Sequence, residues 1–308
     1  MAPQYAQVDE LTRTISLEIL DAAGLPRSSP LQPLLRPLIW PPAHRFATLA
    51  SEFDRRVATA GLMDAIRWAL SLFVDGTRAH GVENIPTSGP LIIASNHPGS
   101  YDGMVIAKHL GREDFRVISS DVPFLRSVRA SARHLIYATL ETSSRMAAAR
   151  EALRHLRDGG ALLLYPSAQV DPDPAFLPGA VEELDRWSAS LPLFIRRAPE
   201  TQVLVSIVSG VLAPSCYRSP LTRLQREERF KRKLAEFLQV GQQIMFGRQF
   251  GLKPEVRFAP ALGAAELGDG RDQDATMTVI LAQAEQLLSQ IKRIDLRAPA
   301  PSASQSTR

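Results

Sequence analysis

A histidine and an aspartate stand five positions apart, His97 and Asp102, in the stretch LIIASNHPGSYDG at residues 91–103. If the Asp102 carboxylate accepts the Nδ1–H of the imidazole, the other ring nitrogen keeps the lone pair that a general base needs. Such a pair can remove the proton from a hydroxyl group while that hydroxyl attacks a carbonyl carbon. The same spacing also arises without chemistry, where a His ends a strand and an Asp caps a helix. The types of the surrounding residues therefore distinguish a catalytic pair from a strand end and a helix cap.

The neighbouring residues predict that this pair lies at the edge of a sheet. Residues 91–95 are an apolar run typical of a buried strand, and Pro98–Ser100 are turn and cap residues before a helical pattern that starts at Asp102. His97 is therefore expected at the carboxyl end of a strand, where ligands of open α/β sheets bind. The amino terminus of the following helix favours the ionised form of Asp102.

A second strand exit lies downstream, where the run ALLL at residues 161–164 is followed by Tyr165-Pro166-Ser167-Ala168-Gln169. A helix and a double-glycine turn, REALRHLRDGG at residues 150–160, precede it, and VENIP at residues 82–86 precedes the His motif. This ordered series, from about residue 75 to residue 215, resembles the glycerolipid acyltransferase family. Members of that family carry an Asn-His-x4-Asp motif, followed by a motif that contains Phe-Pro-Glu-Gly.

The resemblance implies an O-acyltransferase. It would move a fatty acyl group from acyl-CoA or acyl carrier protein to the hydroxyl of a lysophospholipid or related lipid, with His97 as the base and Asp102 as its orienting partner. The chemistry needs neither a cofactor nor a metal ion, because the thioester is a co-substrate and its thiolate leaves readily. Backbone N–H groups of the Gly99-Ser100 turn are candidate donors to the tetrahedral oxyanion, since this turn opens a helix.

The third motif departs from the family at Tyr165–Gln169, because it lacks the Glu and the Arg that help to bind the acceptor's phosphate. Ser167 or Gln169 offers only neutral hydrogen bonds, which are about half as strong as charge-assisted ones to an anion. Arg145 is the nearest match to the arginine of the family's second motif, which is only loosely recognisable at residues 135–138. A catalytically inactive, lipid-binding relative that keeps the fold is therefore the alternative function. The predicted substrate-binding residues are Asn96, Gly99, Ser100, Arg145, Tyr165, Pro166, Ser167 and Gln169.

Apolar runs alternate with helical patterns from residue 76 to residue 215, which predicts an α/β fold. The expected architecture is a mixed, largely parallel β-sheet flanked by helices, with an N-terminal helical extension. Residues 1–75 would form that helical segment, a candidate for the membrane interface, and residues 76–296 the acyltransferase α/β domain. Residues 297–308 (RAPAPSASQSTR) are expected to be disordered. The predicted strands are residues 91–95, 115–118, 135–138, 161–165 and 203–211, and the predicted helices are residues 102–111, 123–133, 144–157 and 180–190.

The composition and charge of the chain limit the classes of partner that it is expected to bind. The 308 residues are 45% hydrophobic and carry a formal net charge of +4, with seven basic residues crowded into residues 218–233. Such a segment suits an anionic membrane surface. Nucleic acid is not expected as a partner, because aromatic residues are only 6% of the chain and no binding signature is present. The single cysteine, the lack of a signal peptide and the lack of a spanning segment favour a cytoplasmic protein that associates peripherally with the inner face of the membrane.

Residues 31–43 are rich in leucine and proline and contain Trp40. Because proline removes a backbone donor and clashes with the preceding turn, this segment is predicted not to continue a helix. It could pack on the domain or lie in the lipid interface, and packing is the expected outcome.

Overall fold

The computed structural model describes residues 4–22, 31–139, 141–187, 190–223, 225–268 and 271–292. Its centre is a seven-stranded sheet in the order β1-β7-β6-β2-β5-β3-β4. Every neighbouring pair is parallel except β6 and β7, which are antiparallel. The predicted mixed, largely parallel sheet flanked by helices is therefore confirmed. The strands are β1 (Arg78–His80), β2 (Leu91–Ser95), β3 (Phe115–Ser120), β4 (Leu135–Ala138), β5 (Ala161–Leu164), β6 (Gln202–Ser209) and β7 (Glu255–Phe258).

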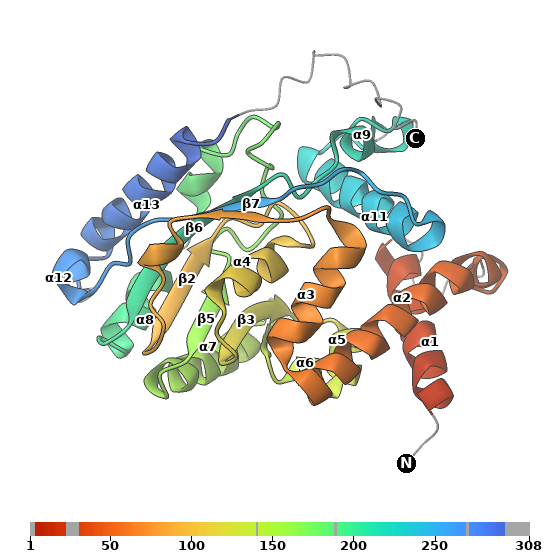
Figure 1. The fold of residues 1–308 in the computed structure, drawn as a ribbon, viewed down its shortest axis with the longest axis horizontal. Coiled ribbons are helices and arrows are strands. Elements are labelled where there is room, and N and C mark those ends of the chain that lie inside the picture. Colours follow the sequence, from red (N-terminus) through yellow and green to blue (C-terminus); the bar gives the residue numbers. More distant parts are fainter. Residues whose placement is uncertain are drawn as a thin grey trace, which may run out of the picture.

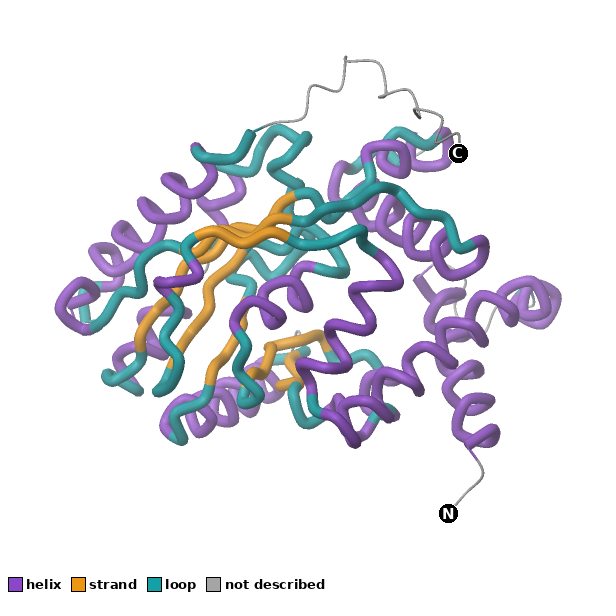
Figure 2. Tube along the Cα trace, in the orientation of Figure 1, coloured by secondary structure: helices purple, strands orange, loops and turns teal. Residues whose placement is uncertain are grey.

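Helices cover both faces of the sheet, which appears as one twisted layer in Figure 2. All five residues of β2 are buried, with Leu91 and Ile93 in the core on one face and Ile92 and Ala94 in the core on the other. Burial on both faces explains the uninterrupted apolar run in this strand. The first face is covered by α3 (Leu62–Phe73), α4 (Asp102–Leu110) and α11 (Glu228–Phe246), and the second by α7 (Thr142–Arg157), α8 (Ser190–Arg197) and α13 (Gln273–Ser289).

Short helices connect these elements. The predicted helix over residues 123–133 is divided at Val128, whose backbone leaves the helical region. The predicted helix over residues 180–190 is also two pieces, a 3-10 helix and the start of α8. The short helices are η1 (Val82–Asn84), α5 (Pro123–Ser127), α6 (Arg129–Ala132), η2 (Glu182–Arg186), α9 (Pro214–Tyr217), α10 (Pro220–Arg223) and α12 (Ala264–Leu267).

Two N-terminal helices, α1 (Gln4–Ala22) and α2 (Gln32–Ala60), lie at the end of the molecule opposite α13 (Figure 1). They form a core of their own, in which Leu11 and Ile15 of α1 pack with Ala43 and Ala47 of α2. This pair docks on α5, where the rings of Phe46 and Phe124 meet edge to face at 5.6 Å. The N-terminal helical extension is thus tied to the sheet domain by apolar contacts.

The prediction that residues 31–43 cannot continue a helix is wrong, because α2 runs through Pro37, Pro41 and Pro42. Pro33, Pro37 and Pro41 are four residues apart and exposed, so they follow one side of the helix. On an exposed side, water can bind the carbonyl groups that lose their partners. The expected packing on the domain is also wrong for Leu34 and Leu38, which are 74% and 71% exposed.

No helix in the described part of the chain is both long enough and apolar enough to cross a bilayer. The predicted disordered tail at residues 297–308 lies outside the described residues.

Candidate active site

His97 lies two residues beyond the end of β2, the strand that is paired with β5 and β6. The loop is fixed on both sides by side chains that bond to backbone. The Asn96 amide donates to the Val208 carbonyl at 2.9 Å, and its oxygen accepts from the Val208 N–H at 2.7 Å. The Asp171 carboxylate accepts the His97 N–H at 2.8 Å, and the Asp171 N–H donates to the His97 carbonyl at 2.7 Å. Asn96 was predicted to bind substrate, but its side-chain amide joins the end of β2 to the backbone of β6.

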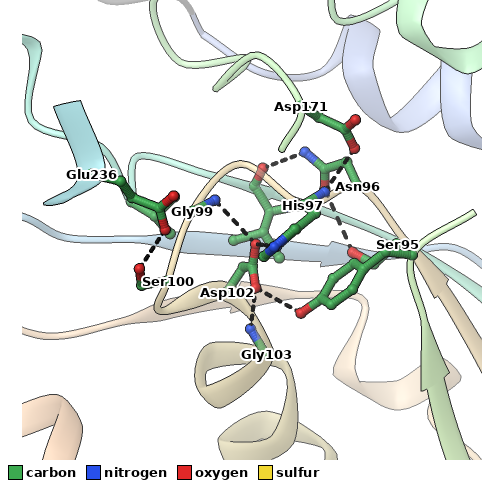
Figure 3. A network of polar contacts seen from close by, with 12 residues as sticks. Ser95, Asn96, His97, Gly99, Ser100, Asp102, Gly103, Asp171 and Glu236 are labelled. Carbon is green, nitrogen blue, oxygen red and sulfur yellow. Dashed lines mark hydrogen bonds and ion pairs between the residues drawn. The ribbon is translucent and has the colours of Figure 1, made fainter. Parts of the chain in front are cut away.

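The imidazole and the carboxylate meet as the spacing predicted. His97 Nδ1 lies 2.7 Å from Asp102 Oδ2 (Figure 3). The Asp102 side chain is only 2% exposed, whereas that of His97 is 29% exposed. No described residue hydrogen-bonds His97 Nε2. The dyad therefore presents the ring nitrogen opposite the carboxylate toward the accessible side, as a general base must.

Asp102 is held by more than the histidine. Its Oδ2 also accepts the Gly99 N–H at 3.2 Å, and its Oδ1 accepts the Gly103 N–H at 2.5 Å and the Tyr165 hydroxyl at 2.6 Å. Because Asp102 starts α4, the helix dipole adds to these donors in stabilising the negative charge. The Gly99 N–H is thus used to hold Asp102, although it was predicted to stabilise the oxyanion.

Tyr165 stands at the end of β5, and the structure places it in contact with the dyad. Besides its hydrogen bond to Asp102, its ring stacks on the His97 imidazole, with 4.3 Å between centroids and 24° between planes. A Cβ atom at Gly103 would lie 2.9 Å from the Tyr165 hydroxyl, so this approach requires glycine. Tyr165 was predicted to bind substrate, but its contacts orient both members of the dyad.

Replacing Tyr165 with phenylalanine keeps the stacked ring and removes the hydroxyl that donates to Asp102. Losing a hydrogen bond to a charged group costs about 1.5–3 kcal/mol, so the free energy of unfolding should fall by this amount in urea titrations. In steady-state kinetics, kcat should fall while KM stays close to the wild-type value, because the dyad is less well oriented. An increase in KM with unchanged kcat would instead place the hydroxyl against substrate.

Three carboxylates surround His97 from different elements. Burial lowers the pKa of the imidazole, but Asp102, Glu236 and Asp171 stabilise the imidazolium more strongly and raise the pKa to about 9. Burial raises the pKa of Asp171 to about 6, although its bond to the His97 N–H opposes the shift. At neutral pH the imidazole of His97 is therefore protonated.

Glu236 comes from the middle of α11, far along the chain from the two motifs. It accepts a hydrogen bond from the Ser100 hydroxyl (Figure 3), and burial raises the pKa of its carboxyl group. A Cβ atom at Gly99 would lie 3.2 Å from Val211 Cγ2, a tight contact, and 3.6 Å from Glu236 Oε1, an ordinary one, so the carboxylate lies directly beside the turn. Ser100, predicted to bind substrate, is thus linked to α11.

The loop after β5 carries the divergent third motif. Pro166 and Ser167 are buried, and the Ser167 hydroxyl lies 3.2 Å from the Gln169 carbonyl oxygen, to which it donates. Ala168 stands where the family motif has glycine, and it has a left-handed backbone with φ of 54°, a conformation that favours glycine. The loop thus adopts a left-handed backbone at this position with alanine in place of the motif's glycine.

Arg145, the predicted second-motif arginine, lies on α7, and its guanidinium donates to Thr142 of the same helix at 3.4 Å. No contact among the described residues joins it to the dyad. Within the described ranges, no group of His, Cys, Asp and Glu side chains is placed to hold a metal ion.

The sequence interpretation did not assign Asp171 or Glu236 to the site. Asp171 lies in the run DPDP at residues 171–174, which reads as turn and cap residues, and its bond to the His97 backbone depends on the fold alone. Glu236 lies in a helical pattern among basic residues, where an exposed ion pair is the ordinary expectation. Only the packing of α11 against Gly99 and Val211 in the folded chain shows that Glu236 belongs to the site.

Residues 55–182 match the family described as Acyltransferase. Among solved structures, the 1-acyl-sn-glycerophosphate (LPA) acyltransferase PlsC from Thermotoga maritima is similar over 93% of this chain and 95% of that chain, with 15% sequence identity and a TM-score of 0.41. No curated protein matches the chain.

The matched segment contains the dyad and the third motif, and it identifies this part of the chain as an acyltransferase domain. Over residues 55–182, this match confirms the family resemblance and the predicted enzyme class, an acyltransferase.

Proposed function

We propose that the protein transfers a fatty acyl group from acyl-CoA or acyl carrier protein to the hydroxyl of a lysophospholipid or related lipid acceptor. The observation that carries the proposal is the 2.7 Å contact between His97 Nδ1 and the buried Asp102, with Nε2 left for a substrate. The acyltransferase match over residues 55–182 supports the reaction class.

In this mechanism, Nε2 of neutral His97 removes the proton from the acceptor hydroxyl as its oxygen attacks the thioester carbonyl. Asp102 stabilises the imidazolium that forms, and Tyr165, Gly99 and Gly103 hold that carboxylate in place. The tetrahedral intermediate then expels the thiolate, which takes up the proton. No covalent bond to the protein forms, and the chain's own residues only move protons and orient the substrates.

The test is a transfer assay. Purified protein is incubated with labelled acyl-CoA or acyl carrier protein and a panel of lysolipids, and the diacyl product is sought by mass spectrometry. Formation of product that depends on His97 supports the proposal. The second candidate function is a catalytically inactive lipid-binding relative, which the missing Glu and Arg of the third motif favour. Lipid binding without turnover would establish that candidate.

We further propose that the protein binds an anionic membrane surface through α2 and α11. Leu31, just before α2, and Leu34 and Leu38 within the helix have exposed side chains at a spacing of three and four residues, which we call the apolar ridge. Phe237 is 52% exposed on α11, whose first turns belong to the basic segment at residues 218–233. The two helices are joined where Arg45 of α2 donates to the Met245 carbonyl. This contact lies at the carboxyl end of α11, whereas the basic segment includes the amino end of that helix. In this proposal the ridge inserts among the lipids and the basic segment is attracted to the anionic head groups of the same bilayer.

The protein should sediment with anionic vesicles at low ionic strength and be partly released by salt, because charge attraction is screened while apolar insertion is not. Replacing Leu34 and Leu38 together with glutamate should reduce the sedimented fraction. Met146 of α7 is 56% exposed, so Met146→Glu is a matched control for added charge on an apolar surface residue. Equal binding of the double variant and this control would contradict the role of the ridge.

A further inference from the structure

A cleft of about 310 Å³ opens between η2 and the first turns of α11. Its walls carry three arginines and three glutamates. They are Glu183, Arg186, Glu227, Glu228, Arg229 and Arg232.

Five of these six charges have partners. Arg186 donates to Glu183 at 2.8 Å, Arg229 donates to Glu227 at 3.0 Å, and Glu228 is paired with Lys231 at 3.4 Å. The sixth charge, that of Arg232, makes no salt bridge to a described residue, although it helps to lower the pKa of the nearby Glu228 carboxyl group.

Arg232 is buried, with only 8% of its surface exposed, and its Nε has no hydrogen-bond partner. No described residue makes a hydrogen bond or ion pair with its guanidinium. A buried cation without a partner costs free energy, and folded proteins usually supply an anion in such a place. An arginine fork that faces a cleft is suited to a phosphate group, which it can bind through two parallel hydrogen bonds.

The cleft adjoins the catalytic loop. Arg232 is four residues before Glu236, about 6 Å along the axis of α11, and Glu236 is bonded to Ser100 of the loop. Glu183 lies both in this cleft and in the wall of a small cavity that Asn96 and Asp171 also line. A ligand with its anionic group at Arg232 therefore has the catalytic loop within reach of its other end.

We propose that Arg232 binds a phosphate group of a substrate and supplies the cationic contact that the loop Tyr165–Gln169 lacks. The inference rests on the proposed acyl transfer. Two sources of phosphate fit this chemistry, the head group of a phosphate-bearing acceptor and the phosphates of the CoA donor. The carboxylates around His97 repel either one, so the phosphate is held one helical turn away while the reacting atoms reach the dyad.

The experiment measures binding rather than turnover, so its result does not depend on acyl transfer. Glycerol 3-phosphate and CoA are titrated separately into the full chain, and their dissociation constants are compared for the wild type and Arg232→Gln. The affinity for one of these ligands should fall about 10- to 100-fold, the effect of losing a charge-assisted hydrogen bond. Loss for glycerol 3-phosphate identifies the acceptor as the source, and loss for CoA identifies the donor.

Lys233→Gln is the matched control, because it removes the same charge from an exposed neighbouring position on α11. It should bind both ligands as the wild type does. Arg232→Lys keeps the positive charge but lacks the forked guanidinium, so its affinity for the ligand should lie between those of the wild type and Arg232→Gln. This variant also serves as the test if Arg232→Gln fails to fold. The proposal is overturned if neither ligand binds the wild type, or if both bind the Arg232 variants as tightly as they bind the wild type. Absence of product in the transfer assay, with binding that depends on Arg232, would overturn only the proposed reaction.

Discussion

Replacing His97 with alanine is expected to lower the rate of acyl transfer by about 10²- to 10⁴-fold, the usual contribution of a general base. The loop should keep its path, because it is fixed through the backbone N–H and carbonyl of His97 and through Asn96. The loss should therefore appear in kcat, with the circular dichroism spectrum and the melting temperature close to those of the wild type.

Asp102→Asn should be impaired in the same direction, because an amide cannot stabilise the imidazolium. This variant must also be checked for folding, since Asp102 accepts two backbone N–H groups and the Tyr165 hydroxyl. Turnover of folded His97→Ala within a few-fold of the wild type would show that the dyad is not the base.

The value of kcat/KM should rise with pH from neutrality to about pH 9 and then level off, because the pKa of His97 in the free protein is raised to about 9. A general base works only in its neutral form, so below this pKa the active fraction increases about tenfold for each pH unit. Between pH 7 and pH 9 the increase should be about 50-fold, because half of the histidine is neutral at its pKa. A pH series with a non-ionising acceptor measures it.

Glu236→Gln isolates one cause of this shift. The groups that face His97 are Asp102 of α4, Asp171 and Tyr165 of the β5 exit, and Glu236 of α11. Removing the Glu236 charge leaves the dyad intact and lowers the pKa of His97, so the rising limb should move to lower pH. An unchanged midpoint in this variant, or a wild-type profile already flat at pH 7, would refute the electrostatic account.

The elements that position the dyad could be predicted from local pattern. The strand over residues 91–95 has the bounds of β2, because an apolar run followed by Pro98 and Gly99 has one obvious end. The contact between His97 and Asp102 is also local, since it spans a single turn. These predictions succeeded because the chain determines them within a few residues.

The rest depends on tertiary contacts. No local pattern brings Glu236 to Ser100 or Asp171 to the His97 backbone, because these pairs are 136 and 74 residues apart. The prediction that residues 31–43 cannot continue a helix failed for a different reason. The general cost of proline in a helix was applied without knowing that the freed carbonyls face water.

The loop of the third motif is fastened by Asp173, which stands beyond the motif. The carboxylate of Asp173 is fully buried and accepts the backbone N–H groups of Ala175, Gly210, Val211 and Leu212 at 2.8–3.1 Å. Burial raises the pKa of this carboxyl group, and the four bonds oppose that shift. Because the anchor and the positions predicted to bind substrate are different residues, Ser167 and Gln169 can change in chemistry while the loop keeps its course. The same scaffold can therefore accommodate a new acceptor head group without rebuilding the dyad.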